Sequence, residues 1–469
     1  MRIAYLLADP GIGVFGTKGA SVHVQEMVRA FRTHGHEVTV YCTKRGNKAG
    51  KPETEAVPED LADLRVITVP VEPAEGGVAA REQAIAQTSL RMAQLAAAED
   101  YELIYERYSL FSEAGATLKS LYTERDSDLD HGFIRDVPLV MEVNAPLLQE
   151  QRNHRELHDD DGARHATLRA LGTADVVSCV SEPVAAWVRE VLAGQIGDPK
   201  VMVIPNGVNT DRIRPRRQGE DHDGPAQDHH RERQDRPFTV GFLGTLKPWH
   251  GTDVLLRAFA ASLHPARSSW RLEFAGAGPE QQRLERMAEE LGVAGQMVFH
   301  GAVAPQDVPE ILTRFDVAAA PYPAAEPGGH YFSPLKVYEY LAAGVAVVAS
   351  AVGELPELLS GQAGNQLEQP AQKVSAYQRG FLVPPGDEDA LANALDQLAA
   401  RPQLRTRLAF AGRAAVVERH TWTRRCGDLL RAVGLSSSTH AGLTTPLPVL
   451  SPAMLAELTD DLPTGVTQG

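Results

Sequence analysis

The chain has 469 residues, a length that exceeds one ordinary hydrophobic core and fits two doubly wound domains followed by a tail. Hydrophobic residues make up 43% of it and charged residues 23%, the balance of a soluble globular protein, which argues against general disorder and a fibrous architecture. The formal net charge of −15 opposes binding to a polyanion, so no nucleic acid partner is expected.

The three cysteines, Cys42, Cys179 and Cys426, lie far apart in the sequence and indicate neither a disulfide framework nor a zinc site, so we expect reduced core thiols. The opening residues, MRIAYLLAD, form too short an apolar stretch for a signal peptide and are typical of a first strand. No segment approaches the roughly 20 apolar residues that a membrane span requires. We therefore expect a cytoplasmic protein, for which peripheral contact with a membrane surface stays open.

The first half of the chain alternates strand-like apolar runs with helical patterns. In chain order the runs are IAYLLA, EVTVYC, RVITV, LVMEV, VVSCV and VMVIP. Between the first two, apolar residues recur at helical spacing from Ala20 to Phe31, and Gly35 ends that helix. This rhythm is the signature of a parallel α/β sheet, and we assign residues 1–210 to a first Rossmann-like domain. An acidic stretch near residues 124–136, ERDSDLDHGFIRD, is predicted to be an insertion.

A charged segment separates the two halves. Residues 211–237 carry almost only charge, Gly, Gln and Pro, which predicts a linker or mobile insertion, and their histidines lack the ligand spacing of a metal site. The runs FTVGFLG, RLEFAGAG, MVFHGAV, DVAAAPY, VAVVAS and GFLVPPG then predict a second domain, 238–415. Its sheet is also expected to be parallel, because no hairpin signals join neighbouring runs. A C-terminal helix, 416–434, which could cross back to the first domain, and a disordered or loosely docked tail, 435–469, complete the chain.

Gly11, Gly13 and Gly16 form GxGxxG between the first strand and the first helix, which is the fingerprint of a dinucleotide-binding turn. The second strand ends in YCTKR, without the Asp or Glu that would hold an NAD ribose. Lys44 and Arg45 would instead suit the 2′-phosphate of NADP. The turn therefore leaves an NADP-dependent oxidoreductase as a minority hypothesis.

Residues 16–20, GTKGA, admit two other interpretations. They form an ordinary turn, or Gly16 and Gly19 let a sugar diphosphate approach the backbone at the start of the helix. Lys18 favours the second interpretation, because a cation at a helix N-terminus opposes the macrodipole unless an anion lies there.

The strongest candidate site is HYFSPLKVYEYLAAG, residues 330–344. Ser333 is a good N-cap and Pro334 suits the first helical position, so we expect a helix to begin here. Lys336 in its first turn would oppose the helix dipole by roughly 0.3–1 kcal/mol if nothing compensates. A diphosphate bound here would neutralise the lysine charge and accept hydrogen bonds from the free N–H groups. Glu339, three residues further on the same face, could accept hydrogen bonds from ribose hydroxyls, although a plain Lys336–Glu339 surface pair explains the spacing equally well.

Other polar residues follow predicted strands of the first domain. Glu106, Arg107 and Tyr108 follow one strand, and Glu142 and Asn144 end another. The carboxyl ends of parallel strands face the ligand crevice in open α/β sheets, so these are candidates for binding an acceptor. Arg107 and Glu142 could equally form a structural pair.

From residue 1 to about residue 433, the chain resembles the retaining glycosyltransferases of family 4. GTKGASVHVQEMVRAFRTHGHEV is similar to the family's glycine loop and first helix, and VIPNGVNTDRIRP to the motif that closes its first domain. VGFLGTLKPWHGTDVLLRAF resembles the opening of the donor domain, and FAGAGPE and FHGAV resemble the nucleotide-contacting loops.

This resemblance implies a GT-B fold, in which two Rossmann-like domains face each other across a cleft. It also implies a retaining, metal-independent transfer of a sugar from a nucleotide-diphosphate donor to a hydroxyl of a glycan, glycolipid or small molecule, without a cofactor. Lys336 would bind the diphosphate and Glu339 the ribose, and Asn144 would position the acceptor. The implied catalytic residues are Lys336, Glu339, Lys247 and Asn144, and the implied donor-binding residues are Gly16, Lys18, Gly19, Gly244, Thr245, His250, Gly276, Gly278, Val303, Tyr331, Ser333, Pro334 and Leu335.

The chain departs from the family pattern at three places. Tyr331 stands where the family often has a glutamate that touches the transferred sugar. Thr245 and His250 stand where many members have an Arg and a Lys, and Asn144 stands where many have a histidine. The donor base, the sugar, the acceptor and the oligomeric state are therefore left unassigned, and a non-catalytic sugar-nucleotide-binding protein stays an alternative.

Overall fold

The computed structural model describes residues 1–51, 55–72, 76–127, 136–194, 199–215, 236–324, 330–361 and 375–435. Most of the expected acidic insertion, most of the charged linker and nearly all of the tail lie outside these ranges, so what was predicted for them stays a prediction. No helix within the described ranges is both long enough and apolar enough to cross a bilayer.

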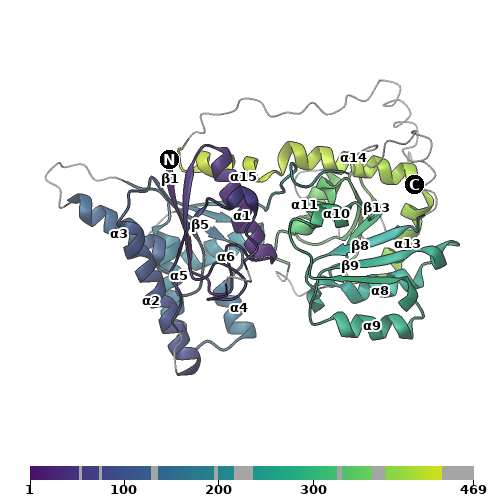
Figure 1. Cartoon of the computed structure of the whole chain (residues 1–469), viewed down its shortest axis with the longest axis horizontal. Helices are drawn as coiled ribbons and strands as arrows, with labels where there is room; N and C mark the ends of the chain where they lie inside the picture. Colours follow the sequence, from purple (N-terminus) through teal and green to yellow (C-terminus); the bar gives the residue numbers. More distant parts are fainter. Residues whose placement is uncertain are drawn as a thin grey trace, which may run out of the picture. The chain divides into compact units, whose positions relative to one another are not determined.

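Seven strands form the first sheet, in the order β3-β2-β1-β4-β5-β6-β7 (Figure 1). Every described pair is parallel, as predicted. The order reverses between β1 and β4, which creates the switch point where open α/β sheets bind ligands. The strands are β1 (Arg2–Leu7), β2 (Glu37–Cys42), β3 (Arg65–Thr68), β4 (Leu103–Arg107), β5 (Leu139–Val143), β6 (Val176–Cys179) and β7 (Lys200–Val203).

Helices cover both faces of this sheet. They are α1 (Gly19–Thr33), α2 (Gly77–Ala97), α3 (Ala114–Ser127), α4 (Leu147–His154), α5 (Asp160–Thr173), α6 (Glu182–Leu192) and α15 (Trp422–Ala432). Successive residues of β1 point to opposite faces, as the period of a strand requires. Ile3, Tyr5 and Leu7 are buried with side chains of α1 and α15, whereas Ala4 and Leu6 are buried with α2, α3, α5 and α6. The three cysteines are free and buried, as predicted.

The second sheet has the order β10-β9-β8-β11-β12-β14-β13. Its described pairs are parallel except that β13 runs antiparallel to β14, so the expectation of a wholly parallel sheet is wrong at this edge. A tight turn joins these two strands, with the Tyr377 N–H donating to the Gly380 carbonyl at 2.9 Å, and a two-residue strand leaves no apolar run to detect. The strands are β8 (Thr239–Leu243), β9 (Arg271–Ala275), β10 (Met297–Gly301), β11 (Val317–Ala320), β12 (Ala346–Ser350), β13 (Ser375–Ala376) and β14 (Phe381–Val383).

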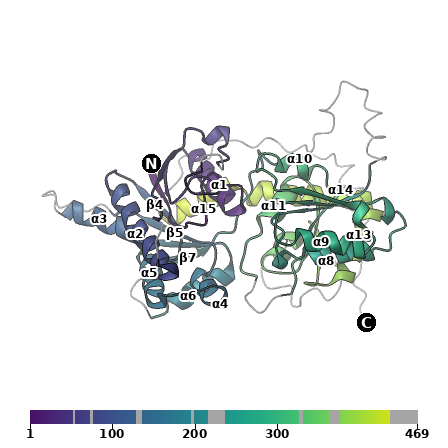
Figure 2. The same cartoon turned by 60° about the horizontal axis from the view of Figure 1, so that its bottom comes forward.

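Helices also cover both faces of the second sheet (Figure 2). They are α8 (Thr252–Ala261), α9 (Gln281–Glu290), α10 (Val308–Leu312), α11 (Leu335–Ala342), α12 (Leu355–Ser360), α13 (Glu388–Ala400) and α14 (Pro402–Arg419). The helices α8, α9 and α13 share one buried cluster with the sheet, and α10, α11 and α12 share the other. The predicted pair of doubly wound α/β domains is confirmed.

The segment after α14 packs on the first domain. The N–H of Val208 donates to the His420 carbonyl at 2.9 Å, and the N–H of Trp422 donates back to Val208 at 3.4 Å. The helix α15 lies beside α1, and Trp422 and Cys426 share a buried cluster with Phe31 (Figure 1).

The substitution Gly207→Ala should destabilise this junction. A Cβ at Gly207 would lie 2.6 Å from the backbone nitrogen of Trp422 and 2.9 Å from the carbonyl carbon of Thr421, and backbone atoms cannot rotate away. We expect an overpacking cost of roughly 1–3 kcal/mol, seen as a lower midpoint of thermal unfolding. Gly295→Ala is the matched control, because a Cβ there meets nothing within 4 Å. Equal midpoints for the two variants would contradict the tight contact.

Candidate functional site

The candidate site is built around the start of α11 in the second domain. This helix begins at Leu335 with Pro334 as its N-cap, so the prediction that Ser333 caps the helix is wrong by one residue. The reason is that the Ser333 hydroxyl is used elsewhere: it donates to the Glu354 carboxylate and accepts the backbone N–H of Asn206 at 3.1 Å. The N-terminus of α11 is left without a side-chain cap.

Lys336 lies in the first turn of α11, and its buried ammonium has no hydrogen-bond partner among the described residues. The ammonium lies 4.1 Å from the centroid of the Phe242 ring and 5.6 Å from that of Tyr322. Burial lowers the pKa of Lys336 to about 7, an effect that Glu339 opposes. A cation at this place is unfavourable because it is removed from water and because it is repelled by the positive end of the helix dipole. A bound anion would relieve both effects.

Glycines directly after β8 and β9 allow close packing beside this ammonium. A Cβ on Gly244 would lie 3.0 Å from Nζ of Lys336, and its φ of +136° is one that L side chains rarely adopt. Gly276 has a φ of +148°, and a Cβ there would lie 2.0 Å from the Gly244 carbonyl oxygen. A Cβ on Gly278 would lie 2.1 Å from the Leu246 carbonyl oxygen. Backbone therefore packs directly on backbone next to Lys336.

The loop after β8 supplies Thr245, Lys247 and His250. The Nδ1 of His250 lies 2.5 Å from the Thr245 carbonyl oxygen, and Nζ of Lys247 lies 5.4 Å from the centroid of the Trp249 ring. Burial, together with the charges of Lys336 and Lys247, lowers the pKa of His250 to about 3, so its ring is neutral. Nδ1–H then donates to the carbonyl, which leaves the two lysines as the cations of this loop and helix.

Glu339 lies one turn beyond Lys336 on α11. Among the described residues its ion-pair partner is Arg212, whose Nη2 lies 4.0 Å from Oε1 of Glu339. Burial raises the pKa of Glu339 to about 7, and Arg212 opposes that rise. The alternative of a plain Lys336–Glu339 surface pair does not hold, because no ion pair within the described ranges joins them and the Glu339 side chain is only 16% exposed.

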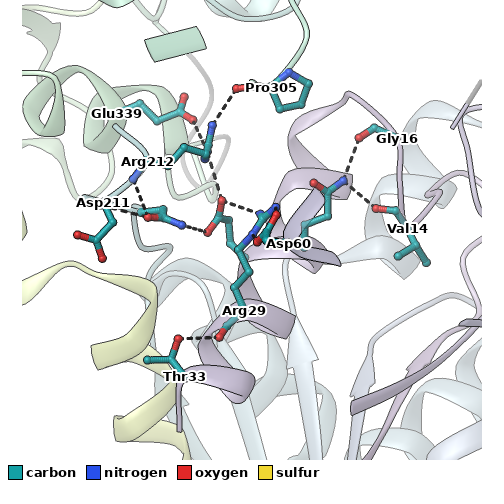
Figure 3. Close-up of polar contacts among 12 residues, drawn as sticks. Val14, Gly16, Arg29, Thr33, Asp60, Asp211, Arg212, Pro305 and Glu339 are labelled. Carbon is teal, nitrogen blue, oxygen red and sulfur yellow. Dashed lines mark hydrogen bonds and ion pairs between the residues drawn. The ribbon is translucent and has the colours of Figure 1, made fainter. Parts of the chain in front are cut away.

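The loop after β10 lies on the other side of Arg212. It carries Val303, which is partly buried against the core around α11, and Pro305, whose carbonyl accepts Nη1–H of Arg212 at 2.8 Å. Figure 3 shows Arg212 between Glu339 and Pro305. The loop expected to contact a base is thus tied to the residue beside Glu339.

Five N–H groups of the glycine turn in the first domain already have partners within the chain. Gly11 donates to the Asp9 carboxylate at 2.6 Å, and Phe15 donates to the Arg45 carbonyl at 2.7 Å. The others are Ile12 to the Asp9 carbonyl (3.2 Å), Gly16 to the Gly13 carbonyl (3.4 Å) and Thr17 to Oδ1 of Asn47 (3.2 Å). A pyrophosphate would find these donors occupied, which weakens the dinucleotide interpretation.

The N-terminus of α1 lies next to that of α11. Lys18 and Gly19 are exposed there, and a Cβ on Gly19 would lie 3.6 Å from Cδ1 of Leu335. Gly16 is buried instead, and a Cβ on it would lie 2.5 Å from Oγ of Ser21, so close packing explains this glycine. Two helix N-termini at one place add their positive potentials.

Most polar residues at the ends of β4 and β5 serve the structure. Burial would raise the pKa of Glu142, but His23, 2.5 Å away, and Arg107, 3.5 Å away, hold it at about 2. The Arg107–Glu142 contact is therefore a structural pair. Glu106 is fully buried and accepts hydrogen bonds from the turn that follows it. Asn144 differs, because its buried Nδ2 has no hydrogen-bond partner within the described ranges.

Tyr331, the residue at the departure from the family's glutamate, contacts the first domain. Its hydroxyl donates to the Glu150 carboxylate of α4, and Oγ of Ser181 donates to its carbonyl. A carboxylate is therefore present beside this position after all, supplied by another helix.

Sequence reasoning missed the residues that join the two domains. Nδ1 of His23 lies 2.9 Å from Oδ1 of Asn206, and Nδ2 of Asn206 donates to the Ser333 carbonyl at 2.7 Å. Glu26 and Arg212 form a second link, with 3.3 Å between Oε1 and Nη2. A signal existed in α1, where His23 and Glu26 interrupt an apolar stripe, but their partners lie 183 and 186 residues away and no local pattern identifies them.

Two family models of glycosyltransferases match the chain. The family described as Glycosyltransferase Family 4 matches residues 17–212, and Glycosyl transferases group 1 matches residues 237–401. The chain is 32% identical over 269 residues to a GDP-mannose-dependent alpha-(1-6)-phosphatidylinositol monomannoside mannosyltransferase of Mycolicibacterium smegmatis, covering 56% of this chain and 63% of that relative. It is 27% identical over 404 residues to a D-inositol 3-phosphate glycosyltransferase of Acidothermus cellulolyticus, covering 81% of each.

Solved structures show the same fold. Sucrose-phosphate synthase from Thermosynechococcus elongatus matches with a TM-score of 0.63 at 20% identity, covering 92% of this chain and 99% of that one. HepE from Anabaena, in complex with UDP, matches with a TM-score of 0.61 at 19% identity, covering 92% and 100%. The GT-B fold predicted from the sequence is confirmed.

Anion binding at α11 should take up a proton. At pH 8, Lys336 is largely uncharged, since its pKa is about 7, and a bound diphosphate restores its charge. Glu339 is already largely ionised at pH 8, so it releases few protons when the ligand binds. We expect uptake of about one proton per nucleoside diphosphate bound, measured by calorimetry in two buffers of different ionisation enthalpy, and affinity that falls as the pH rises above 7.

The variant Lys336→Arg is the control, because a guanidinium stays charged at pH 8. It should bind without this uptake. The same uptake in variant and wild type would show that Lys336 is not the titrating group.

Proposed function

We propose, from the premise that the chain belongs to the glycosyltransferases of family 4, that it moves a sugar from a nucleoside-diphosphate donor to an acceptor hydroxyl with retention of configuration. The observation that carries this proposal is the buried ammonium of Lys336 at an uncapped helix N-terminus, where the described part of the chain offers it no hydrogen-bond partner. A diphosphate supplies the two things this place lacks, a counter-charge and acceptors for free N–H groups.

The chemistry requires stabilisation of a leaving group. Negative charge builds on the departing diphosphate as the bond to the sugar breaks, and Lys336, Lys247 and the N–H dipoles of α11 are fixed where that charge develops. These groups take up the charge without a divalent metal, so turnover is expected to persist in a chelator. His250 is neutral, so it contributes no positive charge to this stabilisation until a bound diphosphate raises its pKa.

The nucleoside end of the donor is assigned to the neighbouring elements. Glu339 accepts the ribose hydroxyls, and the backbone around Gly276, Gly278 and Val303 contacts the base. The named relatives include a GDP-mannose-dependent enzyme and an inositol 3-phosphate glycosyltransferase, so GDP-mannose with inositol-containing acceptors is the first combination to assay.

The acceptor side is assigned to the first domain. The acceptor hydroxyl attacks on the face that the diphosphate leaves, and its proton passes to a phosphate oxygen, so no protein base is required. Asn144 has a free buried amide N–H with which to position the acceptor. Tyr331 and Glu150 together present a hydroxyl and a carboxylate to the transferred sugar.

The variant Lys336→Ala should lower turnover by roughly 10²-fold or more, the range for removing a preorganised charge-stabilising group. Initial rates with the preferred donor measure the effect. Lys200→Ala, at an exposed position of β7, is the control and should keep the wild-type rate. Unchanged turnover in Lys336→Ala would contradict the proposal that the diphosphate binds beside Lys336.

The variant Glu339→Gln should weaken nucleoside diphosphate binding by roughly tenfold, because an amide replaces a charged acceptor of ribose hydroxyls. Calorimetry measures the affinity. Inorganic pyrophosphate, which has no ribose, should bind the variant and the wild type equally. Equal loss for both ligands would mean that Glu339 acts on the phosphates instead.

A further inference from the structure

Arg212 joins three parts of the chain on the nucleoside side of the site. Its Nη1 donates to the Pro305 carbonyl at 2.8 Å, and its Nη2 lies 3.3 Å from Glu26 Oε1 and 4.0 Å from Glu339 Oε1. Figure 3 shows the guanidinium reaching toward Glu339 and Pro305. Pro305 belongs to the loop after β10, Glu339 to α11 and Glu26 to α1, so one side chain contacts three separate elements.

The backbone that carries Arg212 is fixed by a side-chain turn. Oδ1 of Asn209 accepts the N–H groups of Asp211, at 3.2 Å, and Arg212, at 3.0 Å. Nδ2 of Asn209 donates to Glu26 at 3.0 Å. Asn209 therefore fixes both the backbone of Arg212 and the Glu26 carboxylate that the Arg212 guanidinium contacts.

Glu26 is the buried anchor of this arrangement. It is 1% exposed, and besides Asn209 and Arg212 it accepts Nη1–H of Arg29 at 3.1 Å. Arg29 in turn donates two hydrogen bonds to Asp60, at 2.5 and 3.0 Å (Figure 3). Because Arg29 and Asn209 remain on Glu26 when Arg212 is replaced, the substitution leaves no unpaired buried carboxylate, the usual cause of severe destabilisation.

The contact between Arg212 and Glu339 is an ion pair without a hydrogen bond. At 4.0 Å it is too long for a hydrogen bond, so the guanidinium acts on Glu339 through its charge. The lone pairs of the carboxylate are left for other donors. Nε of Arg212 is also buried, and no described residue accepts its N–H, so a donor and the carboxylate acceptors lie in the same part of the site.

We propose that Arg212 is a positioning residue for nucleoside recognition: held by Pro305 and Glu26, it keeps the Glu339 carboxylate charged and directed at the ribose. The inference rests on the proposed function, since the nucleoside is part of the donor. Arginine suits the role because its planar fork contacts a carbonyl and two carboxylates in fixed directions at once, which a lysine cannot do. Through Glu26, donor recognition in the second domain depends on a helix of the first.

The test compares two ligands on the full chain. Calorimetry measures binding of inorganic pyrophosphate and of whichever of UDP, GDP and ADP the wild type binds most tightly. Arg212→Gln should bind the nucleotide about tenfold more weakly. Its affinity for pyrophosphate, which reaches only the Lys336 end, should be unchanged. Arg214→Gln is the matched control, because Arg214 contacts only Asp211 among the described residues, and it should bind both ligands as the wild type does.

A double variant shows whether Arg212 acts through Glu339. If it does, Arg212→Gln/Glu339→Gln should bind the nucleotide about as weakly as Glu339→Gln alone. Independent losses, about hundredfold in total, would overturn the positioning role. Should Arg212→Gln unfold, Arg212→Lys tests the same claim, because it keeps the charge without the fork and should also weaken the nucleotide selectively.

The outcomes separate this inference from the proposed function. A wild-type chain that binds none of the three nucleotides and no pyrophosphate would overturn the proposed function, and the inference with it. A wild type that binds the nucleotide while Arg212→Gln binds it equally well would overturn the inference alone. Equal weakening of nucleotide and pyrophosphate would show a general structural effect and would overturn it as well.

Discussion

The arrangement on which the site depends is a buried lysine ammonium at the start of α11. Its charge has aromatic rings for neighbours, Phe242 and Tyr322, and a helix N-terminus of the same sign behind it. Gly244 leaves room for it, since a Cβ there would approach Nζ of Lys336 to 3.0 Å. Burial destabilises the charged form and lowers the pKa of Lys336 to about 7. A bound anion would interact favourably with both the Lys336 ammonium and the N-terminus of α11.

The two domains are tied together next to this lysine. One link runs from Glu142 through His23 and Asn206 to Ser333, directly before α11. The other runs from Glu26 to Arg212, beside Glu339. Both include a residue of α1, whose N-terminus lies against that of α11. Polar residues on the buried face of α1 therefore connect the first domain to both the phosphate end and the nucleoside end of the proposed donor site.

Local pattern predicted most of the fold because each strand and helix carries its own apolar period. It failed where an element is too short for a period, as at β13, and where a side chain has a distant use, as at Ser333, whose hydroxyl binds Glu354 rather than capping α11. The candidate cation Lys336 was found because it violates a local rule. Arg212 was missed because its partners come from distant segments, and only the folded chain brings them together.

The central claim is that the second domain holds two linked phosphates between Lys336 and the first N–H groups of α11. A crystal structure of the chain with a bound nucleoside diphosphate tests this most directly. The account predicts phosphate oxygens within hydrogen-bond distance of Lys336 and the ribose next to Glu339. Phosphates bound instead at the turn from Gly11 to Gly16, with no ligand beside Lys336, would contradict it.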